Sequence, residues 1–319
     1  MMLGARTGAW AKSGSPTPAA YGGLRFTAEA VNSSVQLTAV GSAPAVTLVK
    51  SFDGVNWEDY TVGDVIELPS IGDFVYLAAG EGGNETFASS RSVYNQFVIN
   101  GLVAASGDIT SLRRFDLIQT TLAGNCYNSM FRGCTGLTSA PELPATTLAV
   151  NCYNNMFEGC TGLTSAPELP ATTLDNFCYG YMFRNCTGLT SAPELPATTL
   201  AVSCYNSMFR GCTGLTSAPE LPETTLAVNC YNSMFRDCTG LTSAPELPAT
   251  TLATSCYRGM FNGCTNISLI KVRFTAWGTQ TSAWVSKVPS TGTFYKPRAL
   301  PEEYGANNIP TGWTVVNID

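Results

Sequence analysis

Apolar and polar positions repeat with a period of 26 residues through the middle of the chain. Near-identical units begin at Leu122, Leu148, Leu174, Leu200 and Leu226, and a sixth that begins at Leu252 decays after Cys264. A fixed period of about 20 to 50 residues is typical of a solenoid, in which each coil packs only against its neighbours. The sequence therefore predicts a solenoid of about six coils over residues 107–270, which include an N-terminal cap.

Each unit combines two hydrophobic patterns. The apolar residues of segment 148–160 fall at offsets 0, 4, 5, 8, 9 and 12, which predicts one face of a helix of two to three turns. Thr146 and Thr147 supply hydroxyls to cap its start, and Gly159 is placed to end it. The next segment predicts a short strand with these residues facing inward: Leu163, Ser165, Pro167 and Leu169. Its prolines lack backbone donors, so the ladder between coils must be brief.

A helix on one side of each coil and a strand on the other predict a curved solenoid. Strands stack about 4.8 Å apart, whereas packed helices need about 8–10 Å. The stack should therefore bend with its strand side concave. Stacked Leu, Met, Phe, Tyr and Cys side chains should form one continuous core.

Residues 24–106 alternate with a period of two and are rich in β-branched and aromatic residues. This pattern predicts short strands separated by turns, with Asp53-Gly54 as a hairpin signal. A small β-sandwich accounts for it, and Trp57 is its expected core aromatic. Residues 1–23 have the composition of an irregular arm. This arm is either a disordered leader or a segment that attaches the protein to a larger assembly.

Residues 271–319 predict a C-terminal cap, because an uncovered end would expose the apolar stripe of the last coil. The pattern favours a continued strand at 267–274, a short helix at 281–288, and a closing hairpin or strand pair at 293–295 and 312–316. We interpret three tryptophans as capping aromatics in preference to a ligand cage: Trp277, Trp284 and Trp313.

Composition narrows the class of function. The formal net charge of −6 argues against nucleic-acid binding, which needs clustered basic groups. The chain has no run of about 18 apolar residues, so we expect no membrane insertion. Residues 1–23 lack the apolar core of a signal peptide. The chain contains no His, and so lacks the commonest general base and metal ligand.

The 12 cysteines occur only in the repeats, as pairs eight residues apart. Eight helical residues rise about 12 Å, whereas a disulfide needs its Cα atoms within about 7 Å. Pairing within a unit is therefore excluded in this interpretation, and pairing between units would have to recur regularly along the stack. We interpret the cysteines as buried free thiols. No Cys-x-x-Cys motif accompanies them, so we expect no metal site and no cofactor.

The repeat motif is distinctive. Met-Phe-x-Gly-Cys-Thr-Gly-Leu-Thr-Ser-Ala-Pro-Glu-Leu-Pro resembles the BspA-type leucine-rich repeats of gut anaerobes and their phages, from Leu112 to about Ile270. Its Ala-Pro-Glu-Leu-Pro segment is longer than the corresponding turn of that family. The segment 2–10 is similar to the start of phage or prophage virion proteins. The resemblance implies an α/β repeat, a leucine-rich-repeat solenoid after a β-sandwich, with a role in surface display and adhesion.

Two sets of outward residues are candidate binding sites. One acidic residue per unit faces outward on the strand side: Glu142, Glu168, Glu194, Glu220 and Glu246. Like charges on neighbouring strands repel, so this row is either a cation- or ligand-binding stripe or a solvated ladder inherited through duplication. In the third unit, Phe177 and Tyr181 would share one side of the predicted helix, either as interface anchors or as a local repacking. We interpret a row of basic residues as a solvated face: Arg132, Arg184, Arg210 and Arg236.

The sequence offers little for catalysis. A Ser or Cys nucleophile would need a base other than His, and the cysteines recur identically in every unit. A glycosidase would need paired carboxylates; Glu302 and Glu303 are adjacent and should diverge, and Glu58 and Asp59 have no evident partner. We therefore expect no catalytic residues and no enzyme activity, with a glycan-cleaving enzyme as a remote alternative.

The expected function is that of a phage or prophage virion fibre or decoration protein that binds the host surface. Its expected partners are other virion proteins, through the arm at residues 1–23, and a host-surface protein or glycan. A homo-oligomer is compatible with this setting. The expected location is the virion surface, after synthesis in the host cytoplasm. The alternative is a bacterial cell-surface adhesin.

Overall fold

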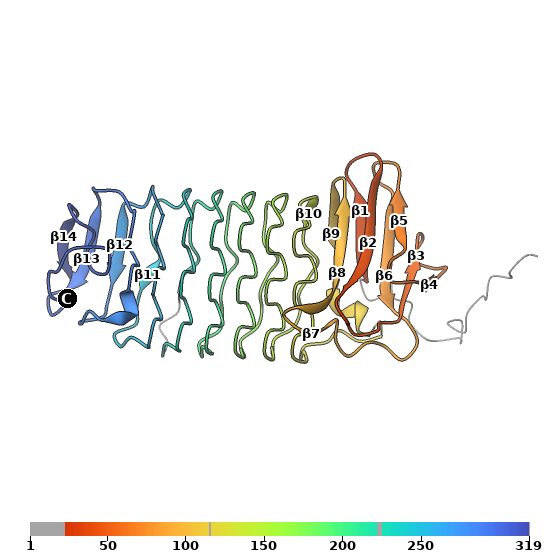
Figure 1. Ribbon diagram of the computed structural model, residues 1–319, viewed down its shortest axis with the longest axis horizontal. Helices are drawn as coiled ribbons and strands as arrows, with labels where there is room; N and C mark the ends of the chain where they lie inside the picture. The colour runs from red at the N-terminus through yellow and green to blue at the C-terminus, as the bar shows by residue number, and fades with distance from the viewer. Residues whose placement is uncertain (1–22, 115, 222–224, 319) are drawn as a thin grey trace, which may run out of the picture.

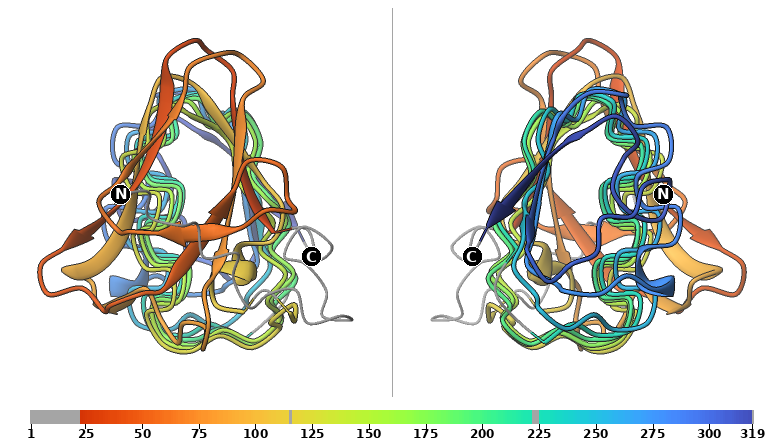
Figure 2. Two further views of the ribbon diagram at one scale, coloured as in Figure 1. Left: turned by 90° about the vertical axis from the view of Figure 1, so that its right-hand side faces the viewer. Right: turned by 90° about the vertical axis from the view of Figure 1, so that its left-hand side faces the viewer.

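A computed structural model describes residues 23–114, 116–221 and 225–318. Two β-sheets form one end of an elongated stack, a β-solenoid forms its middle, and a parallel sheet forms the other end (Figure 1). The coils follow a nearly straight axis and have a triangular outline in end view (Figure 2). The predicted arm and the segment 2–10 lie outside the described residues, except for Gly23.

The first two sheets confirm the period-two prediction. Their strands are β1 (Leu24–Ala28), β2 (Ser33–Val40), β3 (Leu48–Ser51), β4 (Glu58–Tyr60), β5 (Val65–Leu68), β6 (Phe74–Ala79), β7 (Ala88–Ser90), β8 (Val93–Asn100) and β9 (Val103–Ser106). One sheet has the order β5-β2-β8-β7, and the other has the order β10-β9-β1-β6-β3-β4. Strand β10 (Leu137–Ser139) belongs to the first repeat, so this second sheet runs into the solenoid.

The prediction that Trp57 is a core aromatic is wrong. Trp57 is half-buried, and its ring lies 6.4 Å from that of Tyr76, which is itself half-buried. Its indole N–H donates to the Gly54 carbonyl (3.3 Å), which ties the side chain to the hairpin loop. The aromatic pair at the centre is Phe26 and Phe97, both fully buried, with ring centroids 4.9 Å apart.

The first sheets also form the layer on which the solenoid stacks. Phe97 of β8 stacks on Phe131 with ring centroids 5.1 Å apart, and Phe87 stacks on Tyr127 at 5.9 Å. The Phe97 amide donates to the Met130 carbonyl (2.7 Å). A short 3-10 helix, η2 (Ile109–Leu112), is buried within the segment predicted as the N-terminal cap.

The predicted helices of the repeats are wrong, because the described residues contain no α-helix and the segments fold as successive tight turns. Successive backbone N–H groups donate alternately within their own coil and to the next coil. The Asn128 amide bonds Asn125 within the coil (3.1 Å), while the Tyr127 amide bonds Cys152 of the next coil (2.9 Å). In the first coil, three residues spaced by four have positive φ: Asn125 (57°), Ser129 (60°) and Gly133 (72°). Four-residue turns therefore place every fourth side chain on one face of the coil. This spacing of apolar residues resembles the face of a helix, which is why the sequence pattern predicts one.

The predicted curvature is also wrong, because it depended on the thickness of a helix. Along the turn side, successive Phe rings from Phe131 to Phe261 are 5.4–6.0 Å apart. Successive Tyr rings from Tyr127 to Tyr257 are 5.8–6.2 Å apart. These spacings are well below the roughly 8–10 Å between packed helices. Both sides of the coil thus advance by similar steps, and the stack runs nearly straight (Figure 1).

The strand side holds only short ladders, as the prolines predicted. Besides β10, the assigned strand in the repeats is β11 (Glu246–Leu247). The predicted alternation holds for Leu163 and Leu169, which are buried, and fails for Ser165, which is exposed. Gly188 allows close contact between coils, because a Cβ there would lie 2.5 Å from the Thr161 carbonyl oxygen.

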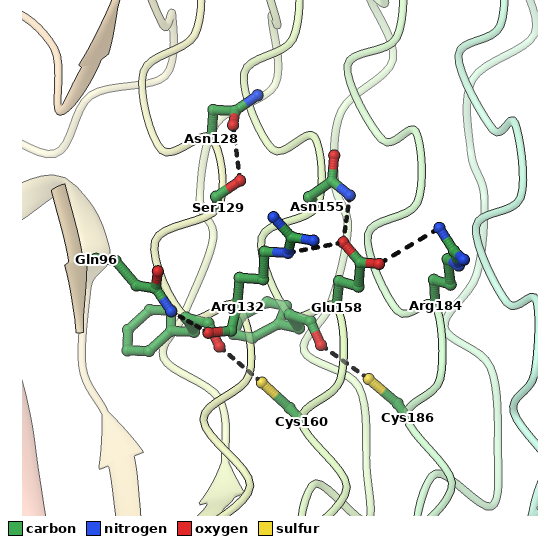
Figure 3. A network of polar contacts seen from close by, with 11 residues as sticks. Gln96, Asn128, Ser129, Arg132, Asn155, Glu158, Cys160, Arg184 and Cys186 are labelled. Carbon is green, nitrogen blue, oxygen red and sulfur yellow. Dashed lines mark hydrogen bonds and ion pairs between the residues drawn. The ribbon is translucent and has the colours of Figure 1, made fainter. Parts of the chain in front are cut away.

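All twelve cysteines are buried free thiols in the structure. From the second unit on, the second cysteine donates to the carbonyl of a phenylalanine 29 residues earlier, as Cys160 does to Phe131 and Cys186 to Phe157, each at 3.0 Å (Figure 3). Burial raises the pKa of Cys160 well above its ordinary value. A thiol at this position therefore acts as a small apolar group that also donates one weak hydrogen bond.

At the C-terminal end, β12 (Leu269–Val272), β13 (Thr293–Pro297) and β14 (Thr314–Ile318) extend β11 into a four-stranded parallel sheet. The predicted strand at 267–274 is thus confirmed, and the closing pair is parallel rather than a hairpin. The predicted helix at 281–288 is wrong: after η3 (Thr279–Thr281), Ala283 (φ 53°) and Lys287 (φ 61°) continue the pattern of turns. Trp284 and Trp313 are buried, and Trp284 lies 6.1 Å from Phe261 at the end of the Phe row.

Candidate functional site

The third coil departs from its neighbours at two strained positions. Phe177 (φ 57°) and Tyr181 (φ 58°) are the only aromatic residues with positive φ in the described part of the chain. The other coils carry Asn, Ser or Gly at these two positions. A left-handed conformation costs an ordinary side chain about 1–2 kcal/mol. Such strain is found at functional sites when the surrounding structure maintains it.

Gly180 accommodates this departure. A Cβ at Gly180 would lie 2.7 Å from Asn154 Nδ2, and most other coils carry an Asn at this position. Asn154 instead donates through Nδ2 to the Phe177 carbonyl (3.2 Å). The third coil thus differs from the others at three nearby positions, with a lost buried side chain at Gly180 and larger side chains at Phe177 and Tyr181.

Phe177 has a partner in the first sheets. The Arg91 guanidinium lies 4.0 Å from the Phe177 ring centroid, and Arg91 also donates to Asn151 Oδ1 through Nε (3.2 Å) and Nη2 (3.1 Å). Arg91 follows β7, and Ser89 of β7 accepts a bond from Asn125 Nδ2 (3.4 Å). The turn between β7 and β8 thus packs on a contact site formed by Asn125, Asn151 and Phe177. The sequence alone did not indicate this contact site, because Arg91 is remote from the repeats in the chain.

Tyr181 lies beside a row of charges. The Arg184 guanidinium is 5.8 Å from its ring centroid. Arg184 also pairs with Glu158 (3.4 Å), which pairs with Arg132 of the preceding coil (3.0 Å) and accepts a bond from Asn155 (Figure 3). Glu158 is only 9% exposed, and the two guanidinium groups offset its charge.

The basic row is therefore not a uniformly solvated face. Arg210 and Arg236 share Asp237, at 3.8 Å and 3.5 Å. Burial, together with the neighbouring Arg236 and Arg184, lowers the pKa of Arg210. The Tyr181 ring is half-buried and lies beside this row of paired charges.

The structure changes how Phe177 and Tyr181 relate to each other. The helix face that they were expected to share does not exist; they occupy consecutive left-handed positions of the turn side. The described contacts include none between the two rings. Phe177 contacts Arg91 of the turn after β7, whereas Tyr181 contacts Arg184 of its own coil.

All five members of the glutamate row are exposed, but their contacts differ. Glu246 pairs with Lys271 and Arg273, each at 2.7 Å, and these cations lower its pKa. At the other end, Glu142 forms a parallel bridge with Asp108. The three central members have no ion-pair partner among the described residues: Glu168, Glu194 and Glu220. No cluster of three or more Asp, Glu, Cys or His in the described part of the chain is arranged to hold a metal ion.

The remaining acidic candidates lie apart from these features. Glu302 lies 3.9 Å from Lys296 Nζ, whereas Glu303 accepts a bond from Asn308 Nδ2 (3.3 Å). Glu58 pairs with Lys50 at 3.4 Å.

Within residues 23–114, 116–221 and 225–318, no helix is long and apolar enough to cross a membrane.

Comparison of the chain with protein-family models, with curated proteins and with solved structures finds no match. The resemblance to BspA-type repeats therefore rests on the repeat motif itself.

Proposed function

We propose that the protein is a non-enzymatic virion fibre or decoration protein of a phage or prophage, which displays a leucine-rich-repeat solenoid of about six coils for host-surface binding. In this proposal, residues 1–23 attach it to other virion proteins and residues 271–319 cap the solenoid. The repeat motif and the segment 2–10 support the setting. The observation that carries the binding role is the third coil, where Phe177 and Tyr181 place aromatic side chains at left-handed positions that the other coils fill with Asn, Ser or Gly.

Tyr181 is the proposed anchor for the host-surface partner. Tyrosine and arginine are enriched among residues that dominate binding energy, and Tyr181 lies beside Arg184. Among the described residues, the Tyr181 ring makes only the longer cation–π contact, with Arg184 at 5.8 Å, whereas the Arg91 guanidinium lies 4.0 Å from the centroid of the Phe177 ring. The near-identical coils supply a rigid rod that carries this single irregular patch.

Restoring the repeat consensus at position 181 tests the proposal. Tyr181→Ser matches Ser129 and Ser207, which adopt the same left-handed conformation, so the coil should fold with a stability close to that of the wild type. Binding of the purified protein to host cells should fall at least tenfold, which corresponds to about 1.4 kcal/mol. Val202→Thr is the matched control, because Val202 is an exposed residue of the next coil and Thr occupies this position in the sixth unit. Unchanged binding by Tyr181→Ser would remove Tyr181 from the site.

Removal of residues 1–23 separates the virion setting from the alternative of a bacterial cell-surface adhesin. Particles assembled with the truncated protein should lack it, while the isolated protein should still bind host cells. Incorporation of the truncated protein into particles at wild-type levels would contradict the attachment role of the arm.

A further inference from the structure

A groove lies at the end of the stack opposite the first sheets. Its volume is about 470 Å³, which falls within the range of small-ligand sites. Two segments form it, the one after β12 and the one between β13 and β14. The lining side chains with aromatic or polar groups are those of Thr275, Trp277, Glu303, Asn307 and Asn308.

Trp277 forms a rigid aromatic wall of this groove. Its indole N–H donates to the Pro301 carbonyl (2.8 Å), and its ring packs against Phe274 (5.5 Å), Trp284 (6.1 Å) and Phe294 (6.2 Å). The side chain is nevertheless only half-buried and lines the groove. The orientation of the ring is thus set before any ligand arrives, which lowers the entropic cost of binding.

Two polar side chains of the groove each have a hydrogen-bonding atom without a partner among the described residues. Asn307 Oδ1 accepts the Ala283 amide (2.7 Å), and its Nδ2 has no partner among the described residues. Glu303 Oε2 accepts from Asn308 Nδ2 (3.3 Å), and no described residue donates to its Oε1. The groove therefore offers an amide donor and a carboxylate acceptor beside an aromatic ring. A sugar presents hydroxyls that both donate and accept, together with an apolar C–H face.

The charge of the groove lining favours neutral sugars over anionic ones. Glu303 is the only ionisable residue of the described groove lining. The adjacent Glu302 does not line the groove and lies near Lys296 (3.9 Å). A single carboxylate disfavours sialate, sulfate or phosphate. It also lacks the second carboxylate that glycoside hydrolysis requires.

We propose that this groove binds one neutral pyranose residue of a glycan, with the apolar face of the sugar on Trp277 and adjacent hydroxyls on Glu303 and Asn307. The site is separate from the third coil and does not depend on the virion setting. The segments that line it follow β12 and join β13 to β14, and these strands lie at the end of the stack away from the first sheets (Figure 1).

The probes are methyl β-D-glucopyranoside, methyl β-D-galactopyranoside and methyl α-D-mannopyranoside, added to the full chain. Saturation-transfer NMR and tryptophan fluorescence should show saturable binding of at least one probe with a Kd of about 1 mM, a reasonable strength for one sugar ring. N-acetylneuraminic acid, which is anionic, should bind at least tenfold more weakly.

Two near-isosteric variants locate the site. Glu303→Gln keeps an acceptor for Asn308 and removes the charge, and Asn307→Asp keeps the acceptor for Ala283 and removes the free donors. Each should weaken sugar binding about tenfold, because Glu303→Gln replaces a charged acceptor by a weaker neutral one and Asn307→Asp removes the amide donors. Glu302→Gln is the matched control and should bind as the wild type does. Thermal unfolding verifies that each variant folds.

Three results would overturn the proposal: no saturable binding of any probe, wild-type affinity of both groove variants, or an equal loss in Glu302→Gln. Cell binding that depends on Tyr181 is measured separately, so failure of the groove leaves the proposed function open to its own test.

Discussion

The guanidinium of Arg91 lies 4.0 Å from the ring centroid of Phe177, so a turn of the first sheets holds the third coil of the solenoid. This contact spans two preceding repeats, and the Asn151 side chain supports it by accepting two bonds from Arg91. The strain at Phe177 therefore has a structural use in joining the two parts of the molecule.

A double-mutant cycle between Arg91→Ala and Phe177→Asn measures that contact. A cation–π pair contributes about 0.5–1 kcal/mol at an exposed site, so the two changes should be non-additive by about that amount in urea unfolding. Phe177→Asn should be more favourable in the Arg91→Ala background, where only the strain remains. Arg258→Ala, at an exposed position of the sixth coil, should show additivity with Phe177→Asn. Additive changes for the Arg91 pair would show that the contact contributes nothing to stability.

Gly188→Ala tests the close approach of neighbouring coils. Its new Cβ would lie 2.5 Å from the Thr161 carbonyl oxygen and 3.1 Å from that of Leu163, so the backbone of one coil must shift. Overpacking of this kind costs about 1–3 kcal/mol, measured as a loss in the free energy of unfolding. Gly124→Ala is the control, because the nearest atom to its Cβ is a methyl of Val150 at 3.2 Å. Equal stability of the two variants would contradict this account.

The buried thiols predict a loss of stability in alkali. Burial raises the pKa of Cys134, Cys186 and Cys264 from an ordinary value of 9.0 to about 12. The unfolded chain therefore releases these protons first, and stability that is complete below about pH 9 should decline as pH rises towards 12. Buried tyrosines such as Tyr153 add to this decline, since burial also raises the pKa of that phenol. Urea midpoints that stay constant from pH 9 to pH 11 would refute the prediction.

Thiol reactivity provides an independent measurement of the same burial. The native protein at pH 8 should react slowly with a thiol reagent, and denaturation without reductant should release all 12 thiols. Cys256, whose pKa burial raises only to about 11, should be among the first modified as pH is increased. A count well below 12 would reveal disulfides that this structure does not contain.

The glutamate row predicts opposite effects for two equivalent residues. Glu246→Gln removes two ion pairs and should destabilise by at most about 1 kcal/mol, because the carboxylate is exposed. Glu194→Gln removes only repulsion from its neighbours and should stabilise slightly at low salt. Because Lys271 and Arg273 lower the pKa of Glu246, its contribution is present above the ordinary value of 4.5 and disappears as pH falls below it. Both effects should shrink at about 1 M salt, and Tm shifts of the same sign for the two variants would disprove the distinction.

Several features of the fold were readable from the sequence. The 26-residue period predicted the solenoid, and two-residue alternation predicted the sheets before it and the strand at 267–274. The sequence also contains a pattern that indicates the four-residue turns. Apolar offsets separated by four, with Asn, Ser or Gly at Asn125, Ser129 and Gly133, match four-residue turns better than a helix of 3.6 residues per turn.

The sequence by itself thus determined the length of each coil and the residues of its core, because both are written in a pattern that repeats. Only the tertiary structure decided between helix and turn, because half of the backbone donors, such as that of Tyr127, find their acceptors in the next coil. The contact between Arg91 and Phe177 and the groove beside Trp277 were also decided there, since each joins segments that no local pattern relates.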